Sequence, residues 1–552
     1  MAEANRKEHF KPGGVDSPGD AAERRRVETA TITAQRRDSA LRSKRLRRES
    51  SRQSLGVSRE PSMQSLGSES AGDGEPMALE TPEDVANMVT QAVGRVKAAK
   101  PVGSREHLEG VRELRRLLSN YEDPPYHDVL AAGAVPLLVA ALQPPVMDAN
   151  ALETIFEAAW ALTNLAVGGH EVVKAVLPAA PVLIAYLGGG SGLAVAEQCA
   201  WALGNVAGED LAFRETLIAN GAVRPLTQLV TKACKALSDT SRALDDDDPL
   251  LAAATTAAWA LSNTLKGAGP EVGEVMGVEG APQCLVELLK TAPQHLATEV
   301  AWVLAYVTAS NEAHLNRLVH LGAIGPLVER LSSAVAQALQ EEIRGRAFLI
   351  PLLRTLGNIA AGGGSAACEQ LLSPDAEPGI EAVVACAQSH HHGLQKEAAW
   401  VLSSLAGAPG RQGVEALKRA GAVPVLMQLL KDSPFHVRKE AAYAVSNICA
   451  GGGGGSGDAE ALNWLFAADR DALGAMVSLM RSADMDAAQL GLQFTEMVLR
   501  LLANGADAVE SVDGIDAMEK VQFGQAPPEL QQMAAALVDK YYGTDTPKAV
   551  EA

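Results

Sequence analysis

Aromatic residues, cysteines and long apolar runs are all scarce in this chain of 552 residues. Aromatic residues make up only 4% of it, so a helical core of Ala, Leu and Val is favoured over a β-sandwich. Six scattered cysteines without a CxxC pair argue against disulfides or zinc and favour a reducing compartment. Because apolar runs of about 18 residues and a signal-peptide core are missing, we expect neither a membrane span nor secretion.

Positive charge is concentrated at the N-terminus. Residues 1–60 hold 15 Lys and Arg against 9 Asp and Glu, whereas the remaining residues hold 33 against 58. These counts predict a basic arm over residues 1–60 and, because Ser, Gly and Glu follow, a flexible linker over residues 61–80. The acidic body argues against direct binding of nucleic acid and favours a basic partner.

The body of the chain repeats itself. The pattern Trp-x-x-x-Asn occurs at Trp160/Asn164, Trp201/Asn205 and Trp259/Asn263, and related patterns begin at Trp302, Arg354, Trp400 and Tyr443. We call these positions the Trp/Asn ladder. Their spacings are 41, 58, 43, 52, 46 and 43 residues, mostly within the range of armadillo and HEAT repeats. The two longer spacings suggest insertions around Asp245–Asp248 and near Ser332–Gln340.

A Gly-Ala motif keeps the same period and precedes apolar helical segments at Gly133, Gly221, Gly322 and Gly421. Glycine suits the end of a helix, and the prolines that follow Gly133 and Gly421 suit a first helical turn. Such units bury their apolar faces only by stacking. We therefore predict an all-α solenoid over residues 81–505 and, with a C-terminal repeat over residues 506–552, about ten repeats in all.

The ladder residues suit recognition of an extended basic peptide. A single Trp/Asn pair would be explained by a core Trp and a helix-end Asn, but repetition favours a binding role. Asn can hydrogen-bond both groups of a peptide bond, and neighbouring indoles can hold the stems and charges of Lys or Arg. Nearby acids, each of which alone could be a solvated surface charge, would select positive charge: Glu197, Glu209, Glu299 and Glu440.

With its exceptions at Tyr306 and Arg354, this series resembles the armadillo domain of the importin-α family. The resemblance implies a right-handed superhelical solenoid that binds basic nuclear localisation signals. It implies a major site at Trp160, Asn164, Gly168, Glu197, Trp201, Asn205, Glu209, Trp259 and Asn263. It implies a minor site at Glu299, Trp302, Arg354, Asn358, Trp400, Glu440, Tyr443 and Asn447. The chain departs from the family pattern at Val173, Ser404, Tyr443 and Gly364.

Both ends of the chain extend the resemblance. The basic clusters resemble the family's importin-β-binding segment: Arg24, Arg25, Arg26, Arg36, Arg37, Lys44, Arg45, Arg47 and Arg48. Residues 506–552 resemble the final repeat, which contacts a recycling exportin with Ran-GTP. The implied partners are thus importin-β, cargo proteins with basic signals and this exportin. The implied localisation is shuttling between cytoplasm and nucleus.

Two other classes of protein compete with this interpretation. A generic armadillo scaffold, of the β-catenin or ubiquitin-ligase-adaptor kind, would lack both the ladder and the arm. An enzyme would need a cluster of His, Cys or paired carboxylates in a pocket. The run His390–His392 does not converge on one helical face, and the glycines at 451–455 lack the Lys-Ser/Thr of a phosphate loop. We expect no catalysis, metal or cofactor.

Overall fold

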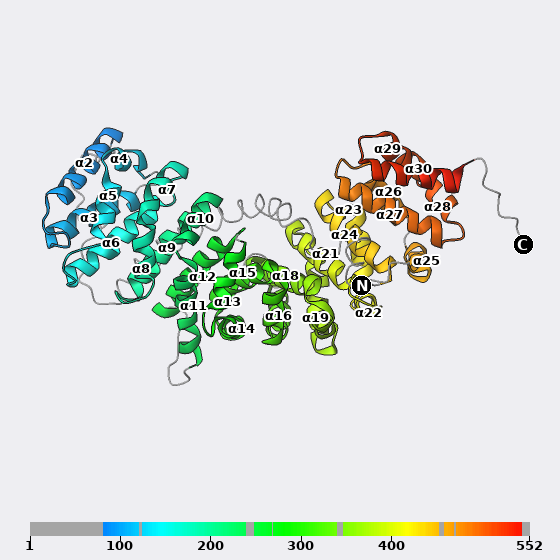
Figure 1. Cartoon of the computed structure of the whole chain (residues 1–552), viewed down its shortest axis with the longest axis horizontal. Helices are drawn as coiled ribbons and strands as arrows, with labels where there is room; N and C mark the ends of the chain where they lie inside the picture. Colours follow the sequence, from blue (N-terminus) through cyan, green and yellow to red (C-terminus); the bar gives the residue numbers. More distant parts are fainter. Residues whose placement is uncertain are drawn as a thin grey trace, which may run out of the picture. The chain divides into compact units, whose positions relative to one another are not determined.

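The computed structural model describes residues 81–120, 124–238, 248–267, 269–338, 346–451, 457–468 and 471–543, and these ranges contain helices and no strand (Figure 1). The expected all-α fold is confirmed. The described residues form two compact units: the N-terminal unit, residues 81–278, and the C-terminal unit, residues 279–543. None of the described helices is long and apolar enough to cross a membrane. The predicted arm and linker lie outside the described residues.

The N-terminal unit is built from α-helices joined by short turns and two 3₁₀ segments. Its elements are α2 (Pro82–Ala98), α3 (Arg105–Asn120), α4 (Tyr126–Ala131), α5 (Ala134–Ala141), α6 (Ala149–Leu165), α7 (His170–Val176), η3 (Leu177–Ala179), α8 (Ala180–Tyr186), α9 (Leu193–Glu209), α10 (Leu211–Ala219), α11 (Val223–Ser238), α12 (Pro249–Leu265), η4 (Pro270–Val272) and α13 (Gly273–Gly277).

The C-terminal unit continues the same succession of shorter and longer helices. Its elements are α14 (Ala281–Thr291), α15 (Gln294–Ser310), α16 (Glu312–His320), α17 (Ile324–Ala338), α18 (Arg346–Gly362), α19 (Gly364–Leu371), η5 (Pro374–Ala376), α20 (Glu377–Ala387), α21 (His392–Ala406), α22 (Gln412–Arg419), α23 (Ala422–Asp432), α24 (Phe435–Cys449), α25 (Ala459–Ala468), α26 (Asp471–Leu479), α27 (Met485–Leu501), α28 (Gly505–Glu510), α29 (Gly514–Phe523) and α30 (Pro528–Tyr542).

The turn between α10 and α11 shows how the Gly-Ala motif ends one helix and starts the next. Gly221 has a φ of 77°, a conformation that glycine adopts without a steric penalty. This turn lets the N–H groups of Gly221 and Ala222 donate back to the carbonyls of Ile218 and Leu217, at 2.8 and 3.1 Å. Positive φ recurs at the three equivalent glycines, which confirms the predicted helix boundaries: Gly133, Gly322 and Gly421.

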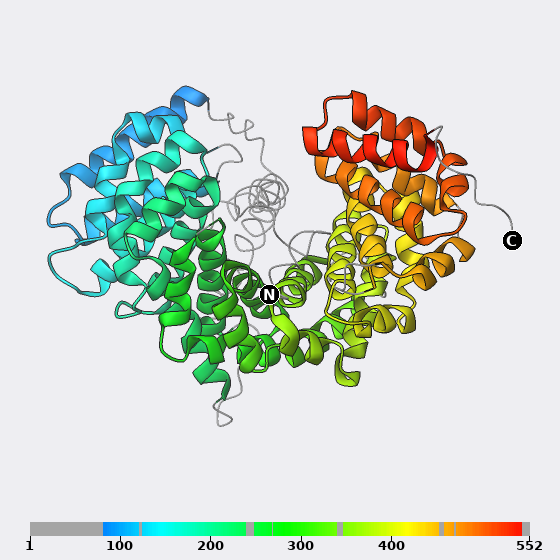
Figure 2. The ribbon, with the colours of Figure 1, turned by 45° about the vertical axis from the view of Figure 1, so that its right-hand side comes forward.

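The last helix of each repeat is long. These long helices pack side by side from repeat to repeat and carry the ladder (Figure 2). In the N-terminal unit these helices are α3, α6, α9 and α12, and in the C-terminal unit they are α15, α18, α21, α24, α27 and α30. The four such helices of the N-terminal unit and the six of the C-terminal unit together agree with the expected number of about ten repeats. Small residues are among those buried on these helices, and the alanine before each tryptophan is fully buried at Ala159, Ala200 and Ala258.

The two longest spacings between repeats, 58 and 52 residues, arise partly because the helix that precedes the ladder helix is longer in these repeats. Helices α11 and α17 have 16 and 15 residues, whereas α14, α20 and α23 each have 11. Ser332 therefore lies inside α17, and the second predicted insertion begins as additional helix. Residues 239–247 and 339–345, where both insertions continue, lie outside the described residues.

A candidate peptide-binding ladder

Three neighbouring helices of the N-terminal unit position the predicted major-site pairs. Trp160 and Asn164 lie on α6, Trp201 and Asn205 on α9, and Trp259 and Asn263 on α12. Because α9 packs against both α6 and α12, the pairs follow one another from helix to helix. The three asparagines are buried, with exposed fractions of 3%, 1% and 8%. Burial requires hydrogen-bond partners for their amides.

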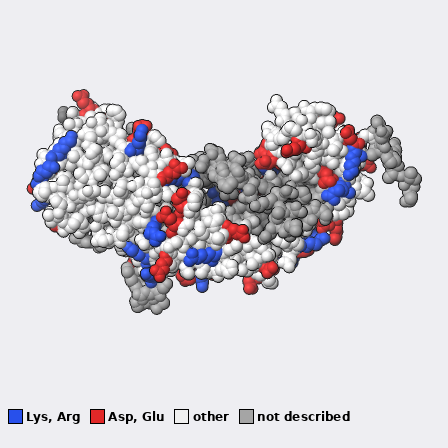
Figure 3. All heavy atoms as spheres, viewed as in Figure 1, with Lys and Arg blue, Asp and Glu red and all other residues white. Residues whose placement is uncertain are grey.

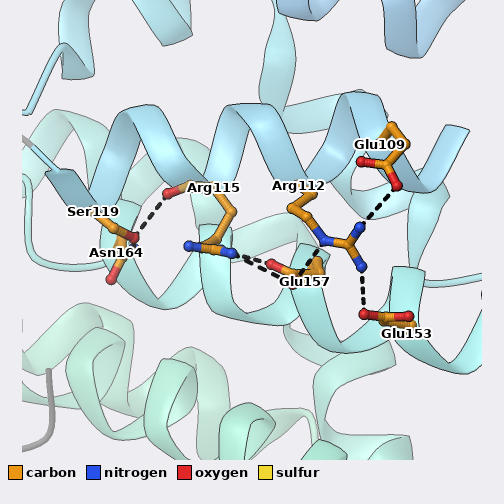
Figure 4. Close-up of polar contacts among 7 residues, drawn as sticks. All are labelled: Glu109, Arg112, Arg115, Ser119, Glu153, Glu157 and Asn164. Atoms are coloured by element: carbon orange, nitrogen blue, oxygen red, sulfur yellow. Dashed lines mark hydrogen bonds and ion pairs between the residues drawn. The ribbon is translucent and has the colours of Figure 1, made fainter. Parts of the chain in front are cut away.

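Each ladder asparagine uses its amide nitrogen to join its helix to the preceding one. Nδ2 of Asn205 donates to the carbonyl of Thr163, and Nδ2 of Asn263 donates to the carbonyl of Gly204, both at 3.1 Å. Each acceptor is the third residue after the preceding tryptophan. At the first helix, Nδ2 of Asn164 donates to Oγ of Ser119 at 2.9 Å (Figure 4). This structural role of the asparagines was not predicted from the sequence.

Asn205 retains one unused polar atom. Its Oδ1 is buried and has no hydrogen-bond partner among the described residues. A buried acceptor left without a partner costs about 1–3 kcal/mol. This atom is therefore suited to accept an N–H group from a bound molecule.

The residue three positions after Trp201, and likewise the residue three positions after Arg354, lies against the next ladder indole. A Cβ atom at Gly204 would lie 2.3 Å from the ring of Trp259, and one at Gly357 would lie 2.2 Å from the ring of Trp400. The equivalent positions hold other small residues: Thr163, Ser262, Ala305 and Ser403. The recurrence of a small residue at this spacing is the sequence signal from which this packing could have been predicted.

The remaining major-site residues border these helices. Glu209 is the last residue of α9 and is half-buried, and Gly168 lies just after α6. A Cβ atom at Gly168 would approach the Tyr126 ring at 3.0 Å, so a larger residue there would have to displace that ring slightly. Glu197 accepts a hydrogen bond from Thr256 Oγ1 at 3.3 Å. Val173, which replaces the family's threonine, is fully buried in the core.

The charge of this part of the surface suits a cationic ligand. In the view of Figure 3, Asp and Glu side chains form a band near the helices labelled α10 and α12 in Figure 1. Glu209 and Asp210 lie at the junction of α9 and α10. Carboxylates beside indole rings provide attraction for the charge and the stem of a basic side chain.

The asparagines of the C-terminal unit donate to more partners than those of the N-terminal unit. Nδ2 of Asn358 on α18 donates to the Ala305 carbonyl and to Thr308 Oγ1, at 2.9 and 3.0 Å. Nδ2 of Asn447 on α24 donates to the carbonyl and to Oγ of Ser403, at 2.9 and 3.2 Å. Both predicted minor-site asparagines thus have less donor capacity for a ligand than Asn205.

The other predicted minor-site residues have internal partners of their own. Arg354 pairs with Glu397 at 2.6 Å, and its guanidinium carbon lies 5.3 Å from the centroid of the Trp302 ring on α15. Ser404, which replaces an asparagine, donates to the carbonyl of Trp400 within α21. The last predicted residues are distributed over α15 and α24: Glu299, Glu440 and Tyr443. Gly364 begins α19 with a φ of 66°.

A second polar cluster lies at the start of the ladder, between α3 and α6 (Figure 4). Arg115 Nε donates to Glu157 Oε2 at 2.6 Å, and Arg112 Nε approaches Glu157 Oε1 at 3.4 Å. Arg112 also pairs with Glu109 and Glu153. Glu157 is fully buried, so its charge depends on these two arginines. This cluster was not predicted from the sequence.

The remaining histidine and cysteine motifs do not form a metal centre in the described part of the chain. No group of three or more His, Cys, Asp or Glu side chains there is arranged to hold a metal ion. His391 precedes α21 without a side-chain hydrogen bond to its first turn, and His392 is the first residue of the helix. No disulfide joins cysteines in the described residues, and burial raises the pKa of the Cys386 thiol to about 12, which suppresses its thiolate.

Stacked helical repeats with a conserved spacing and small contact residues define an armadillo-repeat protein. The Armadillo/beta-catenin-like repeat model matches residues 122–167 and 410–450. The crystal structure of an engineered protein aligns with a TM-score of 0.64 and 25% identity, covering 82% of this chain and 98% of that one.

Two plant proteins are similar over nearly their whole lengths. Importin subunit alpha-9 of Arabidopsis thaliana is 36% identical over 534 residues, covering 95% of each chain. Importin subunit alpha-2 of Oryza sativa subsp. japonica is 36% identical over 536 residues, covering 95% of this chain and 93% of that protein. The chain belongs to the importin-α family, whose members are nuclear transport adaptors rather than enzymes.

Proposed function

We propose that this chain binds basic nuclear localisation signals along the ladder of its N-terminal unit and links them to importin-β. The observation that carries the binding site is the buried, unpartnered Oδ1 of Asn205. A backbone N–H of an extended peptide is a suitable donor for it. Trp160, Trp201 and Trp259 would supply the walls for basic side chains, and Glu209 would pair with the charge of a lysine.

The C-terminal unit would provide the weaker of two signal sites. The amides of Asn358 and Asn447 already donate to two acceptors each, and Ser404 donates within its own helix. A peptide carbonyl must compete with those bonds. The predicted minor site therefore stays part of the proposal, with a lower affinity than the major site.

The two ends of the chain complete the proposed transport cycle. The arm, residues 1–60, would bind importin-β through its basic clusters, and Lys44 to Arg48 would compete with cargo for the ladder. The C-terminal region, residues 506–552, would contact a recycling exportin with Ran-GTP. The protein would then shuttle between cytoplasm and nucleus.

Calorimetric titration of a short Lys/Arg-rich peptide tests the major site. We expect the full chain to bind it, and a chain lacking residues 1–60 to bind it more tightly. Glu209→Lys should weaken binding about tenfold or more, because it replaces an attractive charge with a repulsive one. Asn205→Ala should weaken binding about fivefold, because the one hydrogen bond accepted by Oδ1 contributes about 1 kcal/mol.

Glu215→Lys is the matched control for the charge reversal. Glu215 is exposed on α10 of the same unit and does not belong to the ladder. It makes the same change in net charge and should leave affinity nearly unchanged. Equal losses for the two reversals would mean that binding follows overall charge rather than the proposed site. No binding by the arm-deleted chain would contradict the adaptor function.

A further inference from the structure

The hydrogen bonds between repeats identify which residues of α3 correspond to the ladder. Asn205 and Asn263 bond to the third residue after the preceding tryptophan, and Asn164 bonds to Ser119. Ser119 is therefore equivalent to Thr163, and Arg116 stands at the tryptophan position of α3. Arg115 then occupies the place that is a fully buried alanine on α6, α9 and α12.

Arg115 uses this position to cover one face of the first ladder tryptophan. Its guanidinium carbon lies 4.4 Å from the centroid of the Trp160 ring, and Arg115 itself is only 6% exposed. Because α6 packs between α3 and α9, Arg115 approaches the Trp160 ring from the side of α6 that lies away from Trp201. Glu157, with no exposed area, fixes the guanidinium at 2.6 Å (Figure 4).

The contact of Arg115 with Trp160 and Glu157 resembles the contact that we propose for a basic side chain of a bound peptide. A cation stacked on an indole and paired with a carboxylate is the arrangement expected for a bound Lys or Arg side chain. A related arrangement occurs in the C-terminal unit, where Arg354 on α18 lies over Trp302 of the preceding ladder helix, α15, and pairs with Glu397 on the following one, α21. An arginine of the chain, fixed by a glutamate, thus covers one tryptophan in each unit.

We propose that the Arg115 side chain fills the outermost slot of the ladder, which is the position beside Trp160 and Glu157 where a basic side chain of a ligand would otherwise bind. Arg115 thereby limits the length of signal that the N-terminal unit can bind. This inference rests on the proposed function. A bound peptide can place basic side chains between Trp160 and Trp259, but not on the outer face of Trp160. Additional Lys or Arg residues beyond that point are solvated and add little affinity.

Calorimetry of the full chain with three peptides tests this slot. One is a short basic core, and the other two extend it by two lysines at its N-terminal or its C-terminal end. We expect the wild type to show small gains of similar size at both ends, below about threefold, because solvated charge pairs contribute little. Arg115→Ala should bind one extended peptide about tenfold more tightly than the other, because a lysine can stack on Trp160 and pair with Glu157.

Two further variants separate the slot from general effects. Arg115→Ala combined with Glu157→Gln should lose the preference for one end, because the carboxylate that receives the lysine is gone. Arg95→Ala removes an exposed arginine that pairs with Glu113 at 2.9 Å on the neighbouring pair of helices, and it should behave like the wild type.

The outcomes distinguish this inference from the proposed function. A tenfold preference for one extension in the wild type would mean that the slot is open and the inference is wrong, whether or not Arg115→Ala folds. Equal binding of both extended peptides by a folded Arg115→Ala variant would also overturn it. If the wild type binds the extended peptides but not the core, or binds none of them, the proposed major site fails instead.

Discussion

Gly204 is a residue at which one methyl group decides whether two repeats can pack. A Cβ atom there would lie 2.3 Å from the Trp259 ring, so alanine must displace an indole of the ladder. We expect Gly204→Ala to destabilise the protein by about 1–3 kcal/mol, as overpacking of a core does. Chemical denaturation with fluorescence detection measures the change and reports on the environment of tryptophan.

Gly94→Ala is the control for the helix propensity of alanine. Gly94 lies on the exposed side of α2, and a Cβ atom there would meet nothing within 4 Å. This variant should gain about 0.5–1 kcal/mol, because alanine favours helix over glycine. If Gly204→Ala also stabilised the protein, the position of the Trp259 ring would not require the space left by the absent Cβ.

The sequence predicted the ladder residues but only part of what they do. The recurrence of Trp and Asn at a fixed spacing placed all of them on equivalent helices. It did not reveal that Nδ2 of Asn205 and Asn263 bonds to the preceding helix, because those acceptors are main-chain carbonyls that no side-chain pattern marks. Arg115 was missed for a related reason, since its partner Glu157 is 42 residues away.

At the scale of single elements, the start of α3 contains a histidine whose neutral form stabilises the fold. His107 is 2% exposed, and its Nδ1 accepts a hydrogen bond from the N–H of Gly103 at 3.4 Å. Burial, with a smaller contribution from Lys100, lowers the pKa of His107 below its ordinary value of 6.5. The unfolded chain therefore binds a proton that the folded chain does not, and stability falls as pH falls below about 6.5.

His107→Asn should reduce this acid sensitivity, because asparagine can accept the Gly103 hydrogen bond without titrating. We expect the melting temperature of the wild type to fall more steeply than that of the variant between about pH 7 and pH 5. His127→Asn, at an exposed histidine on α4, is the matched control and should retain the wild-type slope. Parallel pH profiles for wild type and His107→Asn would exclude a contribution from this histidine.

Helix boundaries were predictable where glycine marks them and less so elsewhere. The four Gly-Ala motifs end helices as expected, because each glycine adopts a positive φ that other residues avoid. The extra length of α11 and α17 was not predicted as helix, because an insertion in a repeat is visible only as a longer spacing. Whether added residues extend a helix or form a loop depends on packing, which spacing alone does not report.

At the scale of the whole molecule, charge is divided between the first 60 residues and the remainder. The excess of Lys and Arg in the arm is opposed by a larger excess of Asp and Glu in the body. We expect the full chain to bind importin-β and a chain lacking residues 1–60 to lose that binding. Because exposed ion pairs contribute about 0.2–1 kcal/mol each and are screened by salt, several such contacts should make affinity fall about tenfold or more between low and high salt.

A salt titration by surface plasmon resonance measures this dependence. A variant in which Arg24, Arg25 and Arg26 are replaced by alanine should bind more weakly and show a shallower dependence on salt. Replacing Arg95, Arg419 and Arg500 by alanine removes three exposed or half-exposed charges from the body and serves as the control. Salt-independent binding, or full binding without the arm, would contradict an ionic contact through residues 1–60.

The hydrogen bonds from Asn205 and Asn263 have a consequence for how such chains can change in length. Each bond is received by a main-chain carbonyl, so it does not depend on which side chain the preceding repeat carries there, whether Thr163 or Gly204. A repeat bearing the asparagine can therefore follow any repeat with a small residue at that position. Duplication, deletion or exchange of whole repeats would preserve the junction, and new binding specificities could arise by recombination of modules rather than by redesign of their contacts.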